Sequence, residues 1–293
     1  MSEGQRFEGV GVALVTPFDA DGGLDLDAFA EHAHQMIEGG VDYLVPCGTT
    51  GESATMSSAE QVEVIRTAVR VSNGRVPVVA GAGANATAEA VERSRAAAEA
   101  GADGILSVAP YYNKPPQEGL FQHFEAVAAA TDLPVVLYNV PGRTSSNILP
   151  ETVLRLAEIP NIVAIKEAVA DMRRVEDYAA AGLMVYSGDD PSALEAMRHG
   201  ARGVISVAAN VVPRALARLC EHAAAGDFAS AGRINDDLEA VYRFLALEAN
   251  PIPVKWLLAT IGRIDAGIRL PLVPLDERHH AAGHQLAETL AEQ

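Results

Sequence analysis

Apolar and polar positions alternate along most of the chain in two repeating patterns. Short apolar runs typical of buried strands are each followed by a longer run whose apolar residues lie three or four positions apart, as in an amphipathic helix. The strand-like runs cover residues 10–18, 42–47, 77–80, 104–109, 134–139, 162–167, 184–187 and 203–207. The helix-like runs cover residues 25–38, 59–71, 86–100, 118–130, 150–157, 172–180, 191–199 and 213–224. Eight such units with nearly all-apolar strands predict an α/β fold, a (β/α)8 TIM barrel.

The strand pattern is absent from the last part of the chain. Residues 228–247, 253–261 and 280–291 have the periodicity of three helices, which Asn250-Pro251 and the segment 270–274 separate. We therefore expect a barrel over residues 1–225 and a C-terminal helical appendage over residues 226–293. This appendage is expected to pack on the barrel and on another subunit.

Lys166 lies near the C-terminal end of the apolar run 162–167. Side chains alternate along a strand, so Ile162, Ala164 and Lys166 are expected on the same face. A buried lysine can lose its proton, whereas arginine cannot, and a neutral amine attacks carbonyls to form a Schiff base. The alternative is a structural lysine that reaches water beside Glu167.

Other reactive side chains follow the ends of predicted strands, where TIM barrels carry their chemistry. Thr49 and Thr50 stand between glycines and could bind a small carboxylate, or they could cap the next helix. Tyr138 shares a face with Val136 and would project into the barrel mouth, where it could act as an acid or base. Arg143 could form a forked pair with a carboxylate, or it could be a solvated loop residue.

Three further strand ends carry weaker signals. Tyr111 and Tyr112 enter a loop, where aromatic residues are more often packing than functional. Asp189 and Asp190 could hold a divalent metal, although capping of the helix expected from residue 191 is the simpler interpretation. The backbone carbonyl of Ile205 could line the pocket.

Composition narrows the class of protein. The net charge of −17 argues against binding to nucleic acid or anionic membranes, because both require a basic face. No apolar run approaches membrane-spanning length, and the N-terminus has no signal-peptide pattern. Cys47 and Cys220 are too few for a disulfide framework and fit a reducing compartment. We therefore expect a soluble cytoplasmic protein, and no histidine spacing indicates a metal site.

Taken together, these residues are similar to the dihydrodipicolinate synthase and N-acetylneuraminate lyase family over essentially the whole chain. The matching segments are Gly48-Thr49-Thr50-Gly51-Glu52, Pro110-Tyr111-Tyr112-Asn113-Lys114-Pro115, Tyr138-Asn139-Val140-Pro141-Gly142-Arg143-Thr144, Ile165-Lys166-Glu167-Ala168, Ser187-Gly188-Asp189-Asp190 and Asn250-Pro251-Ile252-Pro253-Val254-Lys255. The two threonines, Arg143 and Glu167 are features of the synthase branch.

This resemblance implies an activity. Pyruvate would form an imine with Lys166, and the derived enamine would attack L-aspartate-4-semialdehyde to give 4-hydroxy-tetrahydrodipicolinate in lysine (diaminopimelate) biosynthesis. No metal or organic cofactor would be needed, because the cationic imine nitrogen is itself the electron sink. The family also implies a homotetramer built as a dimer of dimers.

The same resemblance assigns roles to matching positions. Tyr138 would transfer protons, and Thr49 would connect it to Tyr112, which a neighbouring subunit would lend. The substrate-binding positions would be Thr50, Arg143, Gly188 and Ile205, with Arg143 holding the semialdehyde carboxylate.

A lysine-feedback site is also implied at an interface between subunits. The matching positions are Ser53, Ala54, Ser58, Gln61, Asn85, Glu89 and Tyr111. Positions 58 and 61 are commonly histidine in lysine-sensitive members. Because Ser58 and Gln61 carry no charge, weak or absent inhibition by L-lysine is expected.

Three alternative functions remain open at this point. A sister aldolase acting on 4-hydroxy-2-oxoglutarate or a 2-keto-3-deoxy sugar acid would use the same Lys166 and Tyr138, although Arg143 speaks against it. A non-catalytic metabolite-binding protein could have kept the fold. A metal-dependent barrel enzyme would use Asp189 and Asp190.

Overall fold

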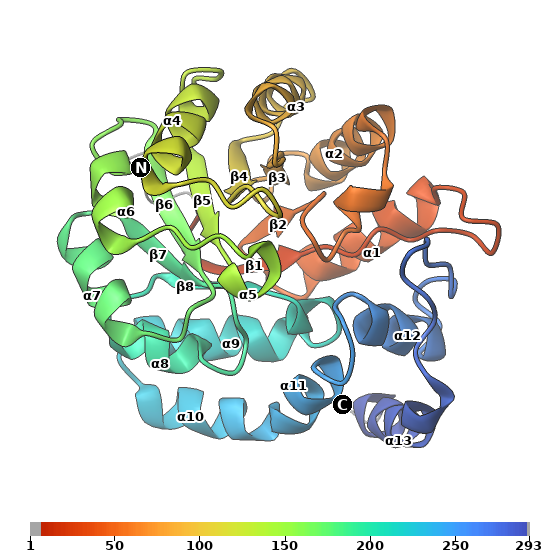
Figure 1. The fold of residues 1–293 in the computed structure, drawn as a ribbon. Coiled ribbons are helices and arrows are strands. Elements are labelled where there is room, and N and C mark those ends of the chain that lie inside the picture. Colours follow the sequence, from red (N-terminus) through yellow and green to blue (C-terminus); the bar gives the residue numbers. More distant parts are fainter. Residues whose placement is uncertain (1–6, 292–293) are drawn as a thin grey trace.

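The eight predicted strands form one parallel sheet that closes on itself (Figure 1). The computed structural model describes residues 7–291. Its strands are β1 (Gly9–Ala13), β2 (Tyr43–Val45), β3 (Val79–Gly81), β4 (Gly104–Val108), β5 (Val135–Asn139), β6 (Ile162–Glu167), β7 (Met184–Ser187) and β8 (Gly203–Ser206). Strand β1 pairs with both β2 and β8, and a bridge between Leu44 and Val78 joins the two ends of the sheet. The predicted (β/α)8 barrel is therefore confirmed.

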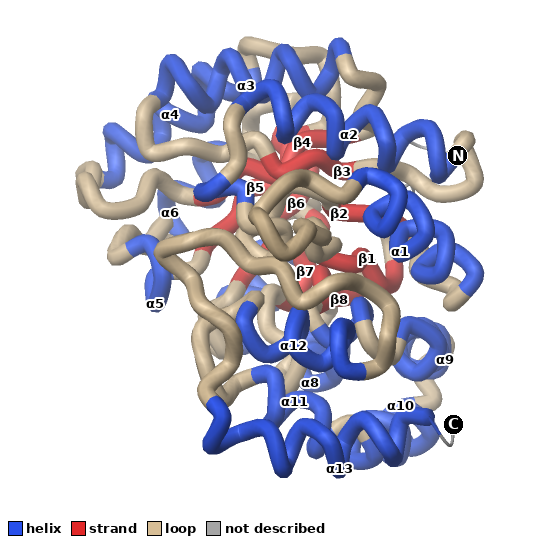
Figure 2. Tube along the Cα trace, turned by 90° about the vertical axis from the view of Figure 1, so that its right-hand side faces the viewer, coloured by secondary structure: helices blue, strands red, loops and turns tan. Residues whose placement is uncertain are grey.

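Helices surround this barrel (Figure 2). They are α1 (Leu26–Glu38), α2 (Ser58–Ser72), α3 (Thr87–Glu99), α4 (Gln117–Ala128), α5 (Pro141–Thr144), α6 (Pro150–Leu156), α7 (Met172–Ala180), α8 (Ala193–Arg198) and α9 (Pro213–Ala224), with short 3₁₀ turns η2 (Ser53–Thr55) and η3 (Ala208–Asn210). Several of these helices begin at capping residues that can be recognised in the sequence. At α2, the Ser57 hydroxyl accepts from the Glu60 N–H and the Glu60 carboxylate accepts from the Ser57 N–H, which forms a capping box.

Strand alternation divides the apolar side chains into two layers. The outer layer lies between the strands and the helices, and it also includes Val254 and Leu257 from the C-terminal region. The inner layer fills the barrel with Ala13, Tyr43, Val45, Val79, Leu106, Val136, Tyr138, Ala164, Tyr186 and Ile205. Because the interior is filled with side chains, chemistry is restricted to the open end where the strands stop.

The C-terminal helices gather on one side of the barrel, next to α8 and α9 (Figure 1). They are α10 (Phe228–Asp237), α11 (Glu239–Leu245), α12 (Ile252–Thr260) and α13 (His280–Ala291), preceded by the turn η4 (Glu277–His279). The shared outer core means that these helices continue the packing of the barrel. Within residues 7–291, no helix is both long and apolar enough to cross a membrane.

Two predicted elements differ substantially from the structure. The first strand ends at Ala13 instead of residue 18, because the chain leaves the sheet ladder there: the Val15 N–H donates to Asn210 Oδ1 and the Thr16 hydroxyl donates to the Gly51 carbonyl. The helix expected over residues 228–247 is divided at Leu238, whose N–H is shared between two carbonyls one residue apart.

Candidate active site

A cavity of about 260 Å³ opens at the C-terminal end of the barrel. Its lining comes from seven of the eight strand ends or the loops after them, and from the C-terminal region. The lining residues are Ala13, Val45, Gly48, Thr49, Thr50, Leu106, Tyr138, Val140, Arg143, Lys166, Ala168, Gly188, Asp189, Val207 and Asn250. The cavity therefore collects most of the polar residues that the strand-end pattern singled out.

Lys166 enters this cavity from β6 and is only 5% exposed. Burial lowers its pKa to about 8; the Asp190 carboxylate opposes this shift and the Arg143 guanidinium adds to it. Near pH 8, a substantial fraction of the side chain is therefore the neutral amine that can attack a carbonyl.

The alternation along β6 holds only in part. Ala164 faces the barrel interior as expected, but Ile162 packs in the outer layer instead of sharing the face of Lys166. The reason is a register shift, since Val135 pairs with Ile162 whereas Val136 pairs with Ala164. The extra residue reverses the alternation before Ala164 and leaves the catalytic end of the strand in the predicted orientation.

Tyr138 lies directly beside the lysine, because Tyr138 and Lys166 are paired in the register of β5 and β6. The Lys166 Nζ stands 4.4 Å from the centroid of the tyrosine ring. Burial raises the pKa of Tyr138 to about 12, and Arg143 opposes the shift. The phenol is therefore protonated at neutral pH, as a proton donor next to an amine must be.

Gly188 and Asp190, just after β7, shape the surroundings of Lys166. A Cβ at Gly188 would stand 3.2 Å from Lys166 Cε and 3.0 Å from the Ala168 side chain, so glycine leaves the amine stem its space. The Asp190 carboxylate accepts from the N–H groups of Val207 and Ala208 at 3.1 and 2.9 Å. It therefore ties the end of β7 to the turn after β8.

A buried polar network lies behind the lysine, on the outer face of β5 and β6. The Glu167 carboxylate accepts from Asn139 Nδ2 at 2.9 Å and from Arg174 Nη1 at 3.1 Å. Burial raises the pKa of Glu167, and these hydrogen bonds oppose the shift. The network joins the two strands that carry Lys166 and Tyr138, and it restricts their relative movement.

Asn250 brings the C-terminal region into the cavity. Its Nδ2 donates to the Thr50 hydroxyl oxygen at 2.9 Å, and its backbone carbonyl lies 3.5 Å from Arg143 Nη2. Because the Thr50 oxygen already accepts from Asn250, its own proton is left to donate elsewhere, such as to a bound carboxylate. Asn250 thus links two candidate carboxylate-binding residues.

Lys255 is also buried but has a different environment from Lys166. Its Nζ pairs with the Glu52 carboxylate and donates to the Thr16 carbonyl at 2.9 Å, 4.3 Å above the Phe18 ring. Burial lowers the pKa of Lys255, and Glu52 opposes the shift. This ion pair connects α12 to the loop that carries Thr49 and Thr50. The role of Lys255 is therefore structural.

We expect Lys255→Met to lower the free energy of unfolding by about 3–5 kcal/mol, because removing one member of a buried pair leaves the other charge uncompensated. Urea unfolding followed by circular dichroism would measure it. The exposed Lys114→Met is the matched control and should change stability by less than about 0.5 kcal/mol. A similarly small loss in Lys255→Met would contradict the role given to the pair.

The predicted site residues fall into three groups. Thr49, Thr50, Tyr138, Arg143, Lys166 and Gly188 line the cavity together. Ile205 is buried inside the barrel and is not among the lining residues, although Val207, two positions later, is. Tyr112 is 87% exposed and does not line the cavity of its own chain.

The predicted lysine-feedback residues lie away from this cavity. They are Ser53 and Ala54 on η2, Ser58 and Gln61 on α2, Asn85 before α3, Glu89 in α3 and Tyr111 after β4. Gln61 is buried, and its Nε2 donates to the Ser53 carbonyl at 2.9 Å. That amide is therefore already engaged in holding η2.

Asp189 and Asp190 do not act as a pair. Asp189 Oδ2 accepts from the hydroxyl and the N–H of Ser192, whereas Asp190 binds the turn after β8. The expectation that both cap one helix is wrong for Asp190, and α8 begins at Ala193 instead of residue 191. Among residues 7–291, no three His, Cys, Asp or Glu side chains are grouped as metal ligands.

Comparison with known proteins bears on the whole chain. The sequence profile of the Dihydrodipicolinate synthetase family matches residues 6–290. The chain belongs to this family. The resemblance inferred from the motifs is therefore confirmed.

Two similar proteins of the family are named as synthases. The 4-hydroxy-tetrahydrodipicolinate synthase of Stutzerimonas stutzeri is 54% identical over 92% of this chain and 93% of its own length. A chloride-inhibited dihydrodipicolinate synthase from Acinetobacter baumannii, solved with pyruvate, has a TM-score of 0.95 at 46% identity, covering 97% of this chain and 99% of its own.

A third relative carries a different ligand. The enzyme from Cyanidioschyzon merolae, solved with lysine bound, has a TM-score of 0.94 at 39% identity and covers 98% of each chain.

Sequence reasoning missed two residues that support the candidate active site, Asn250 and Arg174. Asn250 appeared only as part of a matching segment, because nothing local connects it to Thr50, 200 positions earlier. Arg174 lies in the first turn of α7, and only the fold places it against Glu167. The signal available for Asn250 was its position before Pro251 in a segment that the family shares.

Proposed function

We propose that this chain is a lyase that condenses pyruvate with L-aspartate-4-semialdehyde to give 4-hydroxy-tetrahydrodipicolinate, a step of lysine biosynthesis. One observation carries the proposal: a buried amine of lowered pKa lies over the Tyr138 ring in a cavity that Thr50 and Arg143 also line. The synthase name of relatives at 52–54% identity supports this reaction over a sister aldolase.

The first half of the reaction activates pyruvate. Neutral Lys166 Nζ attacks C2 of pyruvate, and the resulting carbinolamine loses water to give an iminium ion. Tyr138, whose ring lies 4.4 Å from the amine, donates the proton that leaves with that water. Thr50 donates its hydroxyl proton to the pyruvate carboxylate, as its hydrogen bond from Asn250 favours.

The second half forms the carbon–carbon bond. The Tyr138 phenolate left by the first step accepts a methyl proton, which converts the iminium ion to an enamine. The enamine carbon attacks the aldehyde carbon of the second substrate, and Tyr138 returns the proton to the alkoxide that forms there. The guanidinium of Arg143, exposed at the rim, holds that substrate's carboxylate. The substrate's own amine then attacks C2, closes the ring and releases Lys166.

Turnover of purified protein with pyruvate and L-aspartate-4-semialdehyde tests the proposal directly. The expected result is consumption of both substrates in equal amounts. Equal or faster reaction of pyruvate with sugar-derived aldehydes would favour a sister aldolase. Absence of turnover with any aldehyde would indicate a binding protein.

We further propose a homotetramer in which Tyr112 completes the site of a neighbouring subunit. Its side chain is 87% exposed, although its backbone is held at φ 74° with the N–H donating to the Thr144 carbonyl. A non-glycine residue in this left-handed conformation is strained, so the loop presents an aromatic side chain outwards at an energetic cost.

Mixing two inactive variants tests this arrangement. Tyr112→Phe and Lys166→Ala chains should partly restore turnover when they are unfolded and refolded together, because some mixed sites receive both native residues. The same variants refolded separately and then combined are the control. Activity no higher than the sum of the parents would contradict a shared site.

L-Lysine is expected to inhibit this enzyme weakly or not at all. At the proposed feedback positions, Ser58 is short and uncharged, and the Gln61 amide already donates to the Ser53 carbonyl. Each hydrogen bond lost to a charged ligand weakens binding by roughly tenfold or more. Initial rates titrated with L-lysine at fixed pyruvate would measure this, and half-inhibition below about 1 mM would overturn the expectation.

A further inference from the structure

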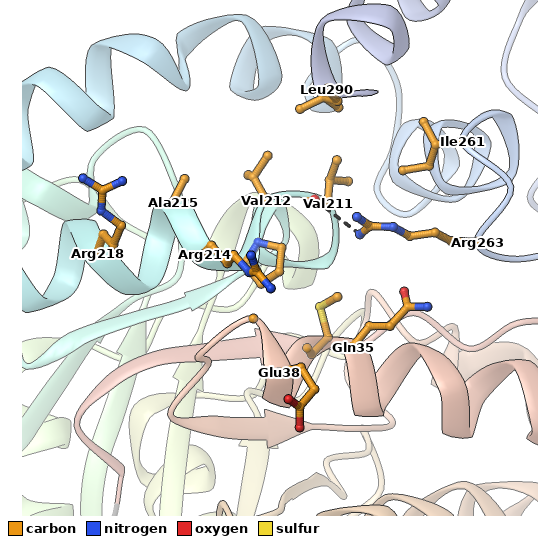
Figure 3. Close-up of a pocket in the computed structure, with 13 residues that line it drawn as sticks. Gln35, Glu38, Val211, Val212, Arg214, Ala215, Arg218, Ile261, Arg263 and Leu290 are labelled. Atoms are coloured by element: carbon orange, nitrogen blue, oxygen red, sulfur yellow. Dashed lines mark hydrogen bonds between the residues drawn. The ribbon is translucent and has the colours of Figure 1, made fainter. Parts of the chain in front are cut away.

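A second and larger cavity lies outside the catalytic site. This groove of about 900 Å³ opens between α1, α9, α12 and α13 (Figure 3). Its apolar lining consists mainly of Met36, Val211, Val212, Ile261 and Leu290. The volume is in the range of cavities that hold small organic ligands.

Three arginines also line this groove: Arg214 and Arg218 on α9, and Arg263 after α12. None of them has a carboxylate within 4.0 Å in the part of the chain that the structure describes. Glu38 is the one acidic residue in the described lining, and it pairs with Arg75 at 2.9 Å. The groove therefore has an excess of positive charge in a chain whose net charge is −17.

The arrangement of these arginines concentrates positive charge at the groove. Arg214 and Arg218 stand four positions apart on one helix, where like charges repel. Arg263 is half-buried, and one of its nitrogens is engaged with the carbonyls of Asn210 and Val211 at 3.3 and 3.4 Å. Figure 3 shows its guanidinium reaching from the α12 side into the space near Arg214.

We propose that this groove is a second ligand site, which binds an organic anion with an apolar body. The guanidinium groups of Arg214 and Arg263 bind its phosphate or carboxylate head, for which their planar geometry is suited. Arg218, which stands apart from them in Figure 3, adds to the positive charge of the groove. The apolar side chains of the groove cover its body. Charge complementarity selects the anion, because the three arginines outnumber the single, already paired carboxylate.

The turn between β8 and α9 connects this groove to the catalytic cavity. Val207 lines the catalytic cavity, whereas Val211 and Val212 line the groove. Between them, Asn210 Nδ2 donates to the Val207 carbonyl at 2.9 Å, and Arg263 binds the Asn210 carbonyl. An anion that binds the Arg263 guanidinium would therefore change its hydrogen bond to the Asn210 carbonyl, in the turn that borders the catalytic cavity. This coupling rests on the function proposed above.

Isothermal titration calorimetry at constant ionic strength would test the site with 1-naphthyl phosphate as the probe. It should bind at least about tenfold more tightly than 1-naphthol, which lacks the charge, or inorganic phosphate, which lacks the apolar body. The variant Arg214→Gln/Arg218→Gln should weaken binding by about tenfold or more, since it removes charge-assisted hydrogen bonds.

The control variant is Arg70→Gln/Arg95→Gln, which makes the same change in net charge on exposed faces of α2 and α3. It should bind the probe as the parent does. Equal affinity in both double variants, or equal affinity for probe and 1-naphthol, would overturn the site. No binding of the probe would do the same.

A kinetic arm tests the coupling separately. With the probe saturating, the KM for pyruvate should change at least about twofold in the parent and stay constant in Arg214→Gln/Arg218→Gln. An unchanged KM in the parent would overturn the coupling. If the protein had no turnover at all, the proposed function would fail, and the calorimetric comparison would still decide the site.

Discussion

Replacing Lys166 by arginine is expected to lower turnover by a factor on the order of a thousand or more, because the covalent intermediate can no longer form. Arginine keeps the positive charge and much of the length but remains protonated at any usable pH. The effect therefore separates the need for a neutral amine from the need for a cation in the cavity.

Borohydride trapping identifies the reacting lysine. In the presence of pyruvate it should add one pyruvate-derived mass to the peptide containing Lys166, and trapping should increase as the pH rises through about 8, where burial has moved the amine's pKa. The chain has two other lysines, so Lys114→Arg is the matched control and should be labelled like the parent. Label on Lys114 or Lys255 would show that the assignment is wrong.

Tyr138→Phe should lower turnover by roughly a hundred- to ten-thousandfold, the range that a general acid or base contributes. The substitution removes one hydroxyl and keeps the ring over the Lys166 amine, so the cavity and the strand pairing should survive. Because proton transfer is needed to form the iminium ion, the loss should fall mainly on kcat.

Tyr186→Phe provides the control for this experiment. Tyr186 is another buried tyrosine of the barrel interior, and its hydroxyl lies 3.6 Å from the Met184 sulfur, away from the residues that line the cavity. It should keep turnover within about twofold of the parent, since no reacting group depends on it. Near-parental turnover of Tyr138→Phe itself would remove the tyrosine from the proton relay.

The barrel could be predicted from the sequence because its signal is local. Each strand carries its own apolar run, and a buried parallel strand needs no partner to be recognised. The cavity residues were also predictable, since strand direction alone brings strand ends such as Lys166, Tyr138 and Thr50 to one opening. The alternation failed at the start of β6, before Ala164, where a register shift that depends on the neighbouring strand intervenes.

The contributions that sequence could not predict are contacts between distant segments. Asn250 reaches Thr50 across 200 positions, and Lys255 reaches Glu52 across 203. Lys255 in particular is a second buried lysine, and its ion pair with Glu52 gives it a different environment from that of Lys166. A periodic pattern reports which side of an element is buried, and it does not report what the buried group meets.

The two links from the C-terminal region make the candidate active site depend on residues that are synthesised after the barrel. All eight strands and α9 precede residue 225, so the barrel's hydrogen-bonded ladder is encoded before Asn250 and Lys255 leave the ribosome. Until those residues dock, the threonine loop lacks both its hydrogen bond at Thr50 and its anchor at Glu52. A nascent barrel would thus hold its nucleophile before it can bind the carboxylate of its substrate, which delays activity until residues 250–255 have been synthesised and docked.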